Sequence, residues 1–170
     1  MDEKAEYSPA EILSNEDALL RGVLRAAEDI KGQTRLIRVK RPGANGEPEV
    51  RFEFGVRGLT DQELDELQQR YMEYDRTRSG IMIPDMSKQH AAKQRSMEIY
   101  AATVDEDRAR LWDSKKLQEA LLSPGELKDL DNARRGAAVV DHVLYAGEKA
   151  DIIDVVEKIG NVETRQLAKN

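Results

Sequence analysis

Cysteine is absent from this 170-residue sequence, and aromatic residues are few: two Phe, five Tyr and one Trp. Without thiols the chain can form neither a disulfide nor a thiolate metal site, and this composition suits a reducing compartment. With so few aromatic side chains, we expect a modest core and a large solvated helix surface. A chain of this length suits one domain with a flexible arm.

Long apolar runs are also missing, and none approaches the roughly 20 residues that span a bilayer. The first residues, MDEKAEYSPAEIL, are acidic and lack the apolar centre of a secretory signal. The net charge of -6 and pI near 5.1 argue against nonspecific binding to nucleic acid or to anionic membranes. We therefore expect a soluble, intracellular protein that binds neither nucleic acid nor a membrane.

Residues suited to chemistry are scarce. The two histidines, His90 and His142, stand far apart without zinc-ligand spacing, and we expect both on the surface. No Walker loop, GxGxxG turn or GxSxG elbow is present. We therefore expect no catalytic residue, no cofactor and no metal, and a protein that is not an enzyme.

A group of carboxylates on one predicted helix is the nearest approach to an acid–base pair. Its members are Asp61, Glu63, Asp65 and Glu66. Most of them fall on the face opposite the leucines, and a tuned acid or base needs burial or a close charge. We interpret the group as a solvated face. The single tryptophan, Trp112, either fills a gap between a helix and a loop, which we favour, or anchors a partner.

Helical signals follow a polar lead that we expect to be disordered over residues 1–9. Ser8 can cap a helix, Pro9 suits its first position and Gly32 suits its end. Between them an apolar stripe is formed by Leu19, Leu20, Val23 and Leu24. This pattern predicts an amphipathic helix ahead of the main domain.

A β-hairpin is predicted next, because the β-prone runs TRLIRVKR (34–41) and EVRFEFGV (49–56) flank the turn-forming PGANGEP. In the second run the alternation places four apolar residues on one face: Val50, Phe52, Phe54 and Val56. One buried and one wet face are typical of a small antiparallel sheet covered by helices on one side. A helix that begins at the Thr60–Glu63 capping box and reaches Tyr74 is expected to supply that cover.

The remaining sequence reads as mostly helical. We expect a loop over RTRSGIMIPDM, a helix over 87–104, a polar connection at DEDRARLW and a short helix carrying Leu117. A new helix is capped at Ser123 and carries a heptad-like apolar seam to Leu144, with a weak point at Gly136. A last helical stretch, DIIDVVEKIGN, is expected to stop at Gly160.

These elements predict an α+β fold, in which an N-terminal β-hairpin or small antiparallel sheet is packed by a mostly helical C-terminal part. We divide the chain into an N-terminal arm with a helix (1–33), a core domain (34–135) and a helical C-terminal extension (136–170).

Three segments, taken in order, resemble the XkdN-like family of phage tail assembly chaperones. VRFEFGVRGLTDQELDELQQRYM is similar to the family's strand, turn and amphipathic helix. MEIYAATVDEDRARLWDSKKLQEAL resembles its small-residue helix, polar connection and following helix, and LLSPGELKDLDNA resembles its LLxPGE helix start. The resemblance covers roughly residues 35–135 and rests on the order and spacing of the segments.

The resemblance implies a chaperone in the bacterial cytoplasm that binds the tape measure protein, keeps it soluble and helps recruit tail-tube subunits. Such a protein is not expected in the mature particle. Two alternatives remain: a structural tail adaptor retained in the particle, and a small DNA-binding regulator. Self-association is left open.

A partner surface is expected in the C-terminal part. The first candidate is the apolar stripe of the last helix: Ile152, Ile153, Val156 and Ile159. The second is the preceding seam, represented by Leu127, Leu130 and Leu144. A helix of about ten residues is marginal alone, so the stripe needs something to pack against. Either it docks on its own domain, or flanking glycines release it to bind the tape measure protein.

Overall fold

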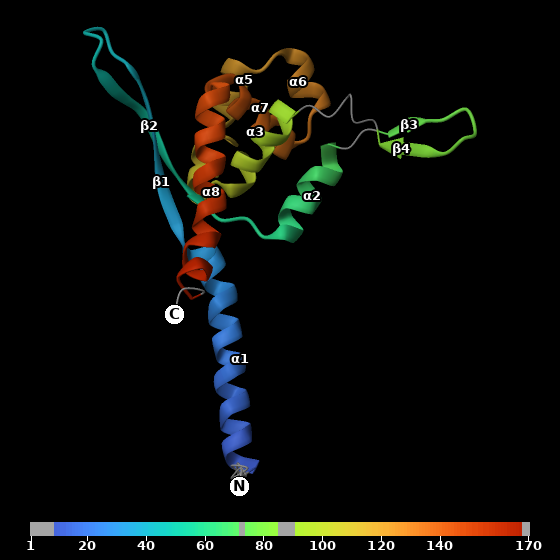
Figure 1. Cartoon of the computed structure of the whole chain (residues 1–170). Helices are drawn as coiled ribbons and strands as arrows, with labels where there is room; N and C mark the ends of the chain where they lie inside the picture. Colours follow the sequence, from blue (N-terminus) through green and yellow to red (C-terminus); the bar gives the residue numbers. More distant parts are fainter. Residues whose placement is uncertain (1–8, 72–73, 85–90, 168–170) are drawn as a thin grey trace.

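The structure is a computed structural model that describes residues 9–71, 74–84 and 91–167 (Figure 1). Its elements are, in chain order, α1 (Pro9–Gly32), β1 (Thr34–Pro42), β2 (Pro48–Arg57), α2 (Asp61–Tyr71), β3 (Tyr74–Arg76), β4 (Met82–Pro84), α3 (Ala91–Ala102), α4 (Asp105–Arg110), α5 (Lys115–Leu121), α6 (Pro124–Asp129), α7 (Asn132–Val143) and α8 (Ala146–Leu167). The predicted α+β fold, with an N-terminal hairpin and a mostly helical remainder, is confirmed.

Helix α1 projects from a body that contains the remaining helices and the base of the β1–β2 hairpin (Figure 1). It begins at Pro9, where a missing backbone N–H costs nothing, and ends at Gly32 as predicted. The expected cap Ser8 and the expected disordered lead, apart from Pro9, lie outside the described residues.

The β1–β2 hairpin is antiparallel, as predicted, but its register shifts between Val39 and Lys40. Val39 pairs with Phe52, and Lys40 pairs with Val50, so Arg51 is an extra residue in β2. Cross-strand partners share a face, and Val50 therefore lies with Lys40 on the exposed side. Val50 is 48% exposed, and its predicted place on the buried face with Phe52 is wrong.

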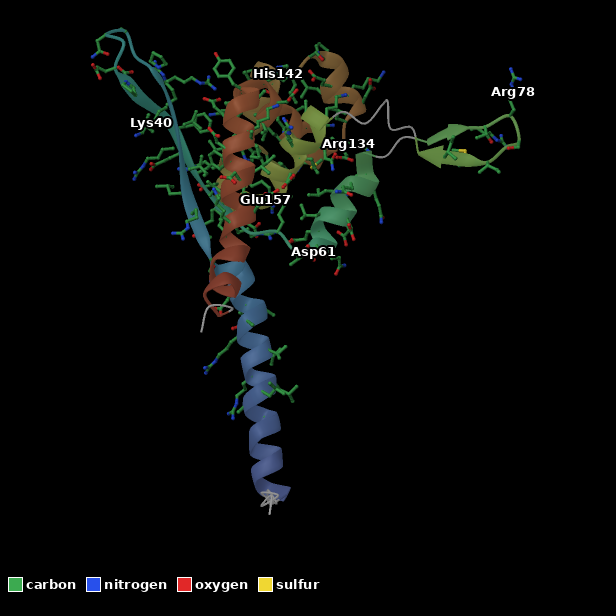
Figure 2. All side chains as sticks on the ribbon, in the orientation of Figure 1. Lys40, Asp61, Arg78, Arg134, His142 and Glu157 are labelled. Atoms are coloured by element: carbon green, nitrogen blue, oxygen red, sulfur yellow. The ribbon has the colours of Figure 1, made fainter. Side chains whose placement is uncertain are left out.

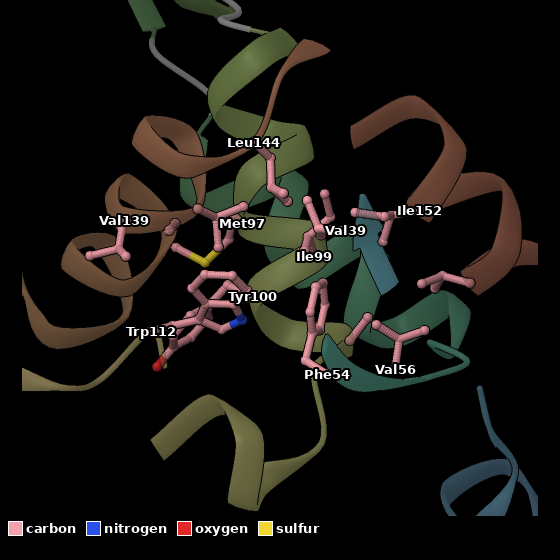
Figure 3. Close-up of a cluster of buried hydrophobic side chains, with 14 of the residues drawn as sticks. Val39, Phe54, Val56, Met97, Ile99, Tyr100, Trp112, Val139, Leu144 and Ile152 are labelled. Carbon is pink, nitrogen blue, oxygen red and sulfur yellow. The ribbon is translucent and has the colours of Figure 1, made fainter. Parts of the chain in front are cut away.

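An aromatic cluster covers the inner face of the hairpin. Phe54 is fully buried, and its ring meets Trp112 edge-on with centroids 5.3 Å apart (Figure 3). The indole Nε1 of Trp112 donates a hydrogen bond of 2.8 Å to Oγ1 of Thr103, which removes the cost of burying that polar group. Trp112 is 1% exposed, so its predicted role in filling an internal gap is confirmed.

Helix α2 begins at the predicted capping box. The backbone N–H of Glu63 donates to Oγ1 of Thr60, and the N–H of Thr60 donates to the Glu63 carboxylate. The helix ends at Tyr71, so its predicted extension to Tyr74 is wrong. It packs beside α3 and contributes Leu67 to the core cluster that contains Phe54, while Trp112 contacts the Phe54 ring directly.

The segment expected to be a loop contains a second short hairpin, formed by β3 and β4. Its turn closes through the N–H of Gly80, which donates to the carbonyl of Thr77, and Gly80 has a φ of 84°. Glycine adopts that conformation without a Cβ clash. Figure 2 shows the hairpin extending from the body, with Arg78 at its tip.

Helix α3 is the centre of the body and packs against α2, α7 and α8. It begins at Ala91, and the expected start near Ser87 lies outside the described residues. The predicted polar connection after it is instead the short helix α4. That helix joins the sheet, because the N–H of Gly55 donates to Oδ2 of Asp107 at 2.7 Å.

The predicted continuous seam from Leu127 to Leu144 is divided between two helices. The capping box of Ser123 and Glu126 starts α6 as predicted, but α6 ends at Asp129. Asp131 then caps α7, its side chain accepting a hydrogen bond from the N–H of Arg134. The break therefore falls at residues 130–131, where a new cap is available, and Gly136 lies inside α7.

Helix α8 continues to Leu167, so the predicted stop at Gly160 is wrong. Gly147 lies in the first turn of α8, where helical geometry is compatible with it, and does not interrupt the helix. The boundary drawn at residues 135/136 falls inside α7. Because α7 and α8 both contribute buried side chains to the one core cluster, residues 136–159 pack together with the preceding body.

An ion pair between a buried ammonium and an exposed carboxylate ties α8 to its neighbours. The ammonium of Lys149, whose side chain is 6% exposed, donates hydrogen bonds to Oδ1 of Asp141 and to Oγ of Ser96. The pKa of Asp141 is lowered, because the stabilising bonds from Lys149 and Ser96 outweigh the desolvation by burial. Burying an ammonium without partners is costly, so these hydrogen bonds favour the observed packing of α8 against α3 and α7.

Candidate partner-binding surface

The apolar stripe predicted on the last helix faces inward. Ile152, Val156 and Ile159 are 4%, 3% and 8% exposed, and Ile153 is partly buried against the same core. Their burial corresponds to the alternative in which the helix docks on its own domain. In this structure these side chains are occupied by intramolecular packing.

The residues of the second predicted surface, the seam of leucines, are also buried or partly buried. Leu144 is 4% exposed and lies in the core, as Figure 3 shows, and Leu127 packs against its edge. Leu130 is partly buried at the end of α6. These three leucines do not form one exposed face, because the break between α6 and α7 separates them.

The most exposed apolar helix face in the described chain lies on α1. Leu19, Leu20, Val23 and Leu24 are 68%, 60%, 60% and 65% exposed, and we call these four residues the α1 stripe. Their spacing places them on one side of the helix, since residues three and four apart are neighbours on its surface. Every side chain described between Asp17 and Asp29 is exposed. The stripe therefore lies open to solvent.

Charged side chains of both signs surround the α1 stripe. Arg21 and Arg25 carry positive charge, and Asp17, Glu28 and Asp29 carry negative charge. Nε of Arg21 donates to the backbone carbonyl of Asp17 at 3.1 Å, which draws the arginine along the helix surface. The charged side chains keep the arm hydrated, whereas exposure of the apolar stripe to water is unfavourable.

A smaller apolar patch lies on the β3–β4 hairpin. Ile81, Met82 and Ile83 are 62%, 57% and 48% exposed. Met82 and Ile83 are consecutive residues of β4 and so lie on opposite faces, and Ile81 precedes the strand. This patch therefore does not present one continuous surface as the helix does. The α1 stripe is therefore the stronger candidate.

The carboxylates expected to form a solvated face are exposed at Asp61, Asp65 and Glu66, whereas Glu63 is partly buried. The pKa of Glu63 is lowered to about 2, chiefly by the hydrogen bond from the Arg57 guanidinium and also by the bonds from Thr60. These contacts hold the start of α2 against the end of β2. Glu63 therefore has a structural role.

Carboxylates also line an open depression of about 390 Å³ between α3 and α8, which includes Glu98, Asp154 and Glu157. Burial and then the charge of Glu157 raise the pKa of Glu98. Within the described ranges, no group of three or more histidine or acidic side chains is arranged to hold a metal ion. The depression offers a surface for cationic side chains of its own chain, such as Arg95.

Both histidines are expected on the surface, and the structure describes one of them. His142 is exposed, as expected, and its Nε2 lies 3.4 Å from Oε1 of Glu126. His90 lies outside the described residues. In the part of the chain that the structure covers, no helix has the length and apolar character needed to cross a membrane.

Comparisons with known proteins returned no similar protein: no protein-family model, no curated protein and no solved structure matches the chain.

The sequence pattern identifies the α1 stripe as an apolar helix face, but the predicted partner surface lies at the other end of the chain. Both helices carry similar stripes, and periodicity alone does not tell which one meets the core. The position of each helix in the chain could have indicated which stripe is buried. Helix α1 precedes the hairpin, whereas α8 follows helices that can fold back onto the sheet.

Proposed function

We propose that the protein is a tail assembly chaperone of a phage or prophage, which binds the tape measure protein and keeps it soluble. The observation that carries the proposal is the exposed α1 stripe, which charged side chains of both signs surround. Contiguous exposed apolar surface marks interaction sites, and an amphipathic helix can lie along the apolar face of another helix. A long helical tape measure protein is a partner of that chemistry.

The three segments that resemble the XkdN-like family also support the proposal. They cover β2 with α2, then α3 with α4 and α5, and finally α6 with the start of α7. In this arrangement they supply the body, and α1 supplies a surface outside it. The role is binding without turnover, in the cytoplasm of the bacterial host, and includes help in recruiting tail-tube subunits.

The physical basis is the covering of apolar surface. Each copy that places the α1 stripe on an apolar seam removes that seam from water, at about 25 cal/mol per Å² of apolar area. Each copy also brings a net charge of -6, so several copies along one partner repel other such complexes. Both effects oppose aggregation of the partner before the tail tube forms.

The test is co-expression with the product of the neighbouring large open reading frame, as the tape measure candidate, followed by measurement of its soluble yield. We expect wild type to raise the yield and the double variant Leu20→Asp, Val23→Asp to lose most of that effect. The control is Ala18→Asp, Gly22→Asp, which adds the same charge to the same helix on its opposite face. Ala18 and Gly22 are exposed, and no atom outside the helix lies near Gly22.

Equal soluble yields with both double variants would exclude the α1 stripe as the binding surface. No gain with wild type would overturn the chaperone proposal as a whole. Mass spectrometry of purified particles separates the chaperone from the structural adaptor: a chaperone is absent from particles, and an adaptor is present.

A further inference from the structure

Helix α1 is 24 residues long, and every side chain described between Asp17 and Asp29 is exposed. No other element therefore covers the α1 stripe. Figure 1 shows it extending away from the body, joined to it only at its C-terminal end. Isolated helices are marginal in water, and most helical stability in proteins comes from packing an amphipathic face. A partner for this face would therefore stabilise the helix as well as cover its apolar surface.

The α1 stripe is symmetric about its own centre. Its four members flank Arg21 and Gly22 in mirror order, with Leu20 and Val23 nearest the centre and Leu19 and Leu24 outside them. Arg21 and Gly22 fall on the opposite side of the helix, because successive residues turn by about 100°. A two-fold axis through this centre therefore places the four apolar residues of the stripe against one another.

From this symmetry we propose that α1 pairs with α1 of a second copy of the chain, in antiparallel orientation. Leu20 of one copy lies at the level of Val23 of the second copy, and Leu19 lies at the level of Leu24. Self-complementary contact of one patch on both subunits is what a two-fold dimer requires. The proposal stands on the α1 stripe itself and does not depend on the chaperone function.

The length of α1 supports the antiparallel orientation. The centre of the stripe lies within about one residue of the middle of the helix that runs from Pro9 to Gly32, so an antiparallel pair overlaps over nearly its whole length. At about 1.5 Å per residue, the stripe centre is roughly 16 Å from Gly32, where the body begins. The two bodies then lie at opposite ends, whereas a parallel pair brings both to the same end. Antiparallel alignment also sets opposite helix dipoles side by side.

Under the proposed chaperone function, on which this consequence rests, the pairing competes with partner binding. A second copy and a tape measure helix use the same four side chains, so they exclude each other. Free protein would then keep its apolar face covered until a partner helix replaces the second copy.

Sedimentation equilibrium of the purified full chain, without any other protein, tests the pairing. We expect wild type and the control Ala18→Asp, Gly22→Asp to show a monomer–dimer equilibrium. Leu20→Asp, Val23→Asp should stay monomeric over the same concentrations, since pairing would bury four unpaired carboxylates. The near-UV signal of Trp112, which lies in the body, verifies that each variant remains folded.

A wild-type chain that stays monomeric at all concentrations overturns the proposal, as does a dimer that persists in Leu20→Asp, Val23→Asp. Orientation is tested with single cysteines, which the natural chain lacks. Copies carrying Leu20→Cys are mixed with copies carrying Val23→Cys and oxidised. Antiparallel pairing gives mainly the mixed disulfide, whereas predominance of the Leu20→Cys homodimer indicates a parallel pair and overturns the antiparallel geometry.

Because this experiment contains no tape measure protein, its failure leaves the co-expression test unaffected. Conversely, a dimer with no effect on partner solubility supports the pairing and removes the chaperone function. The two proposals are therefore separable.

Discussion

The ring of Tyr100 occupies the space that a side chain on residue 136 would need. A Cβ at Gly136 would lie 2.2 Å from Cε2 of Tyr100 and 3.2 Å from Oδ1 of Asp113. The ring cannot easily move, because its hydroxyl donates a 3.0 Å hydrogen bond to Asp113 and its face carries the guanidinium of Arg108. Gly136 thus allows α7 to approach α3 closely, at the cost of local helix propensity.

The first prediction follows from this contact. Gly136→Ala gains about 1 kcal/mol of helix propensity but overpacks the core by about 1–3 kcal/mol. We expect a net loss of up to about 2 kcal/mol in the free energy of unfolding, measured by urea titration. The control is Gly147→Ala in the first turn of α8, where no atom lies within 4 Å of the added Cβ. That variant should be neutral or more stable, and a stabilised Gly136→Ala would contradict the close approach.

The second prediction tests the bulge in β2. Phe54→Ala removes a fully buried ring that contacts Trp112, and it should cost about 3–5 kcal/mol. Val50→Ala should cost less than about 0.5 kcal/mol, because Val50 is half-exposed on the other face. The measurement is the free energy of unfolding of both variants. Similar large losses at the two positions would show that the strand alternates without the bulge.

The third prediction concerns pH. The pKa of Glu63 is lowered to about 2 in the folded chain from its ordinary 4.5, first by the hydrogen bond from Arg57. The unfolded chain therefore binds this proton at higher pH, so the stabilisation exists above about 4.5 and is lost as pH falls towards 2. Glu63 is 34% exposed, and solvent screening limits the contribution to about 1 kcal/mol.

Urea unfolding of wild type and Glu63→Gln over that pH range measures this contribution. Wild type should be more stable at neutral pH, and the difference should shrink as the pH approaches 2. Glu66→Gln, which removes an exposed carboxylate from the same helix, provides the control. A constant difference between wild type and Glu63→Gln across the range would refute the role of its ionisation.

The fourth prediction addresses the buried ammonium of Lys149. Asp141→Asn removes its charge partner but leaves Ser96, and we expect a loss of about 2–3 kcal/mol in the free energy of unfolding. The matched control is Asp154→Asn, which breaks the exposed pair with Lys158 and should cost no more than about 0.5 kcal/mol. Equal effects of the two substitutions would mean that burial of Lys149 has no energetic consequence.

Local signals in the sequence determined several elements correctly. The capping boxes at Thr60 and Ser123 start α2 and α6, and the turn-rich segment 42–48 joins β1 to β2. These features depend on contacts between residues close in the chain, such as a side-chain oxygen and an N–H three positions later. Because such contacts need no distant partner, sequence reasoning recovers them and, with them, the α+β class.

Only the tertiary structure decided which apolar stripes are buried. Ile152 and Leu20 occupy similar helical patterns, yet Ile152 lies in the core and Leu20 is 60% exposed. Gly160 does not end α8, and Gly136 does not break α7, although both positions weaken a helix locally. Packing over many residues outweighs a local penalty of about 1 kcal/mol, and it acts between segments that are distant in sequence. The sequence by itself therefore determined the elements and most of their starts, while long-range packing determined which apolar face remained exposed.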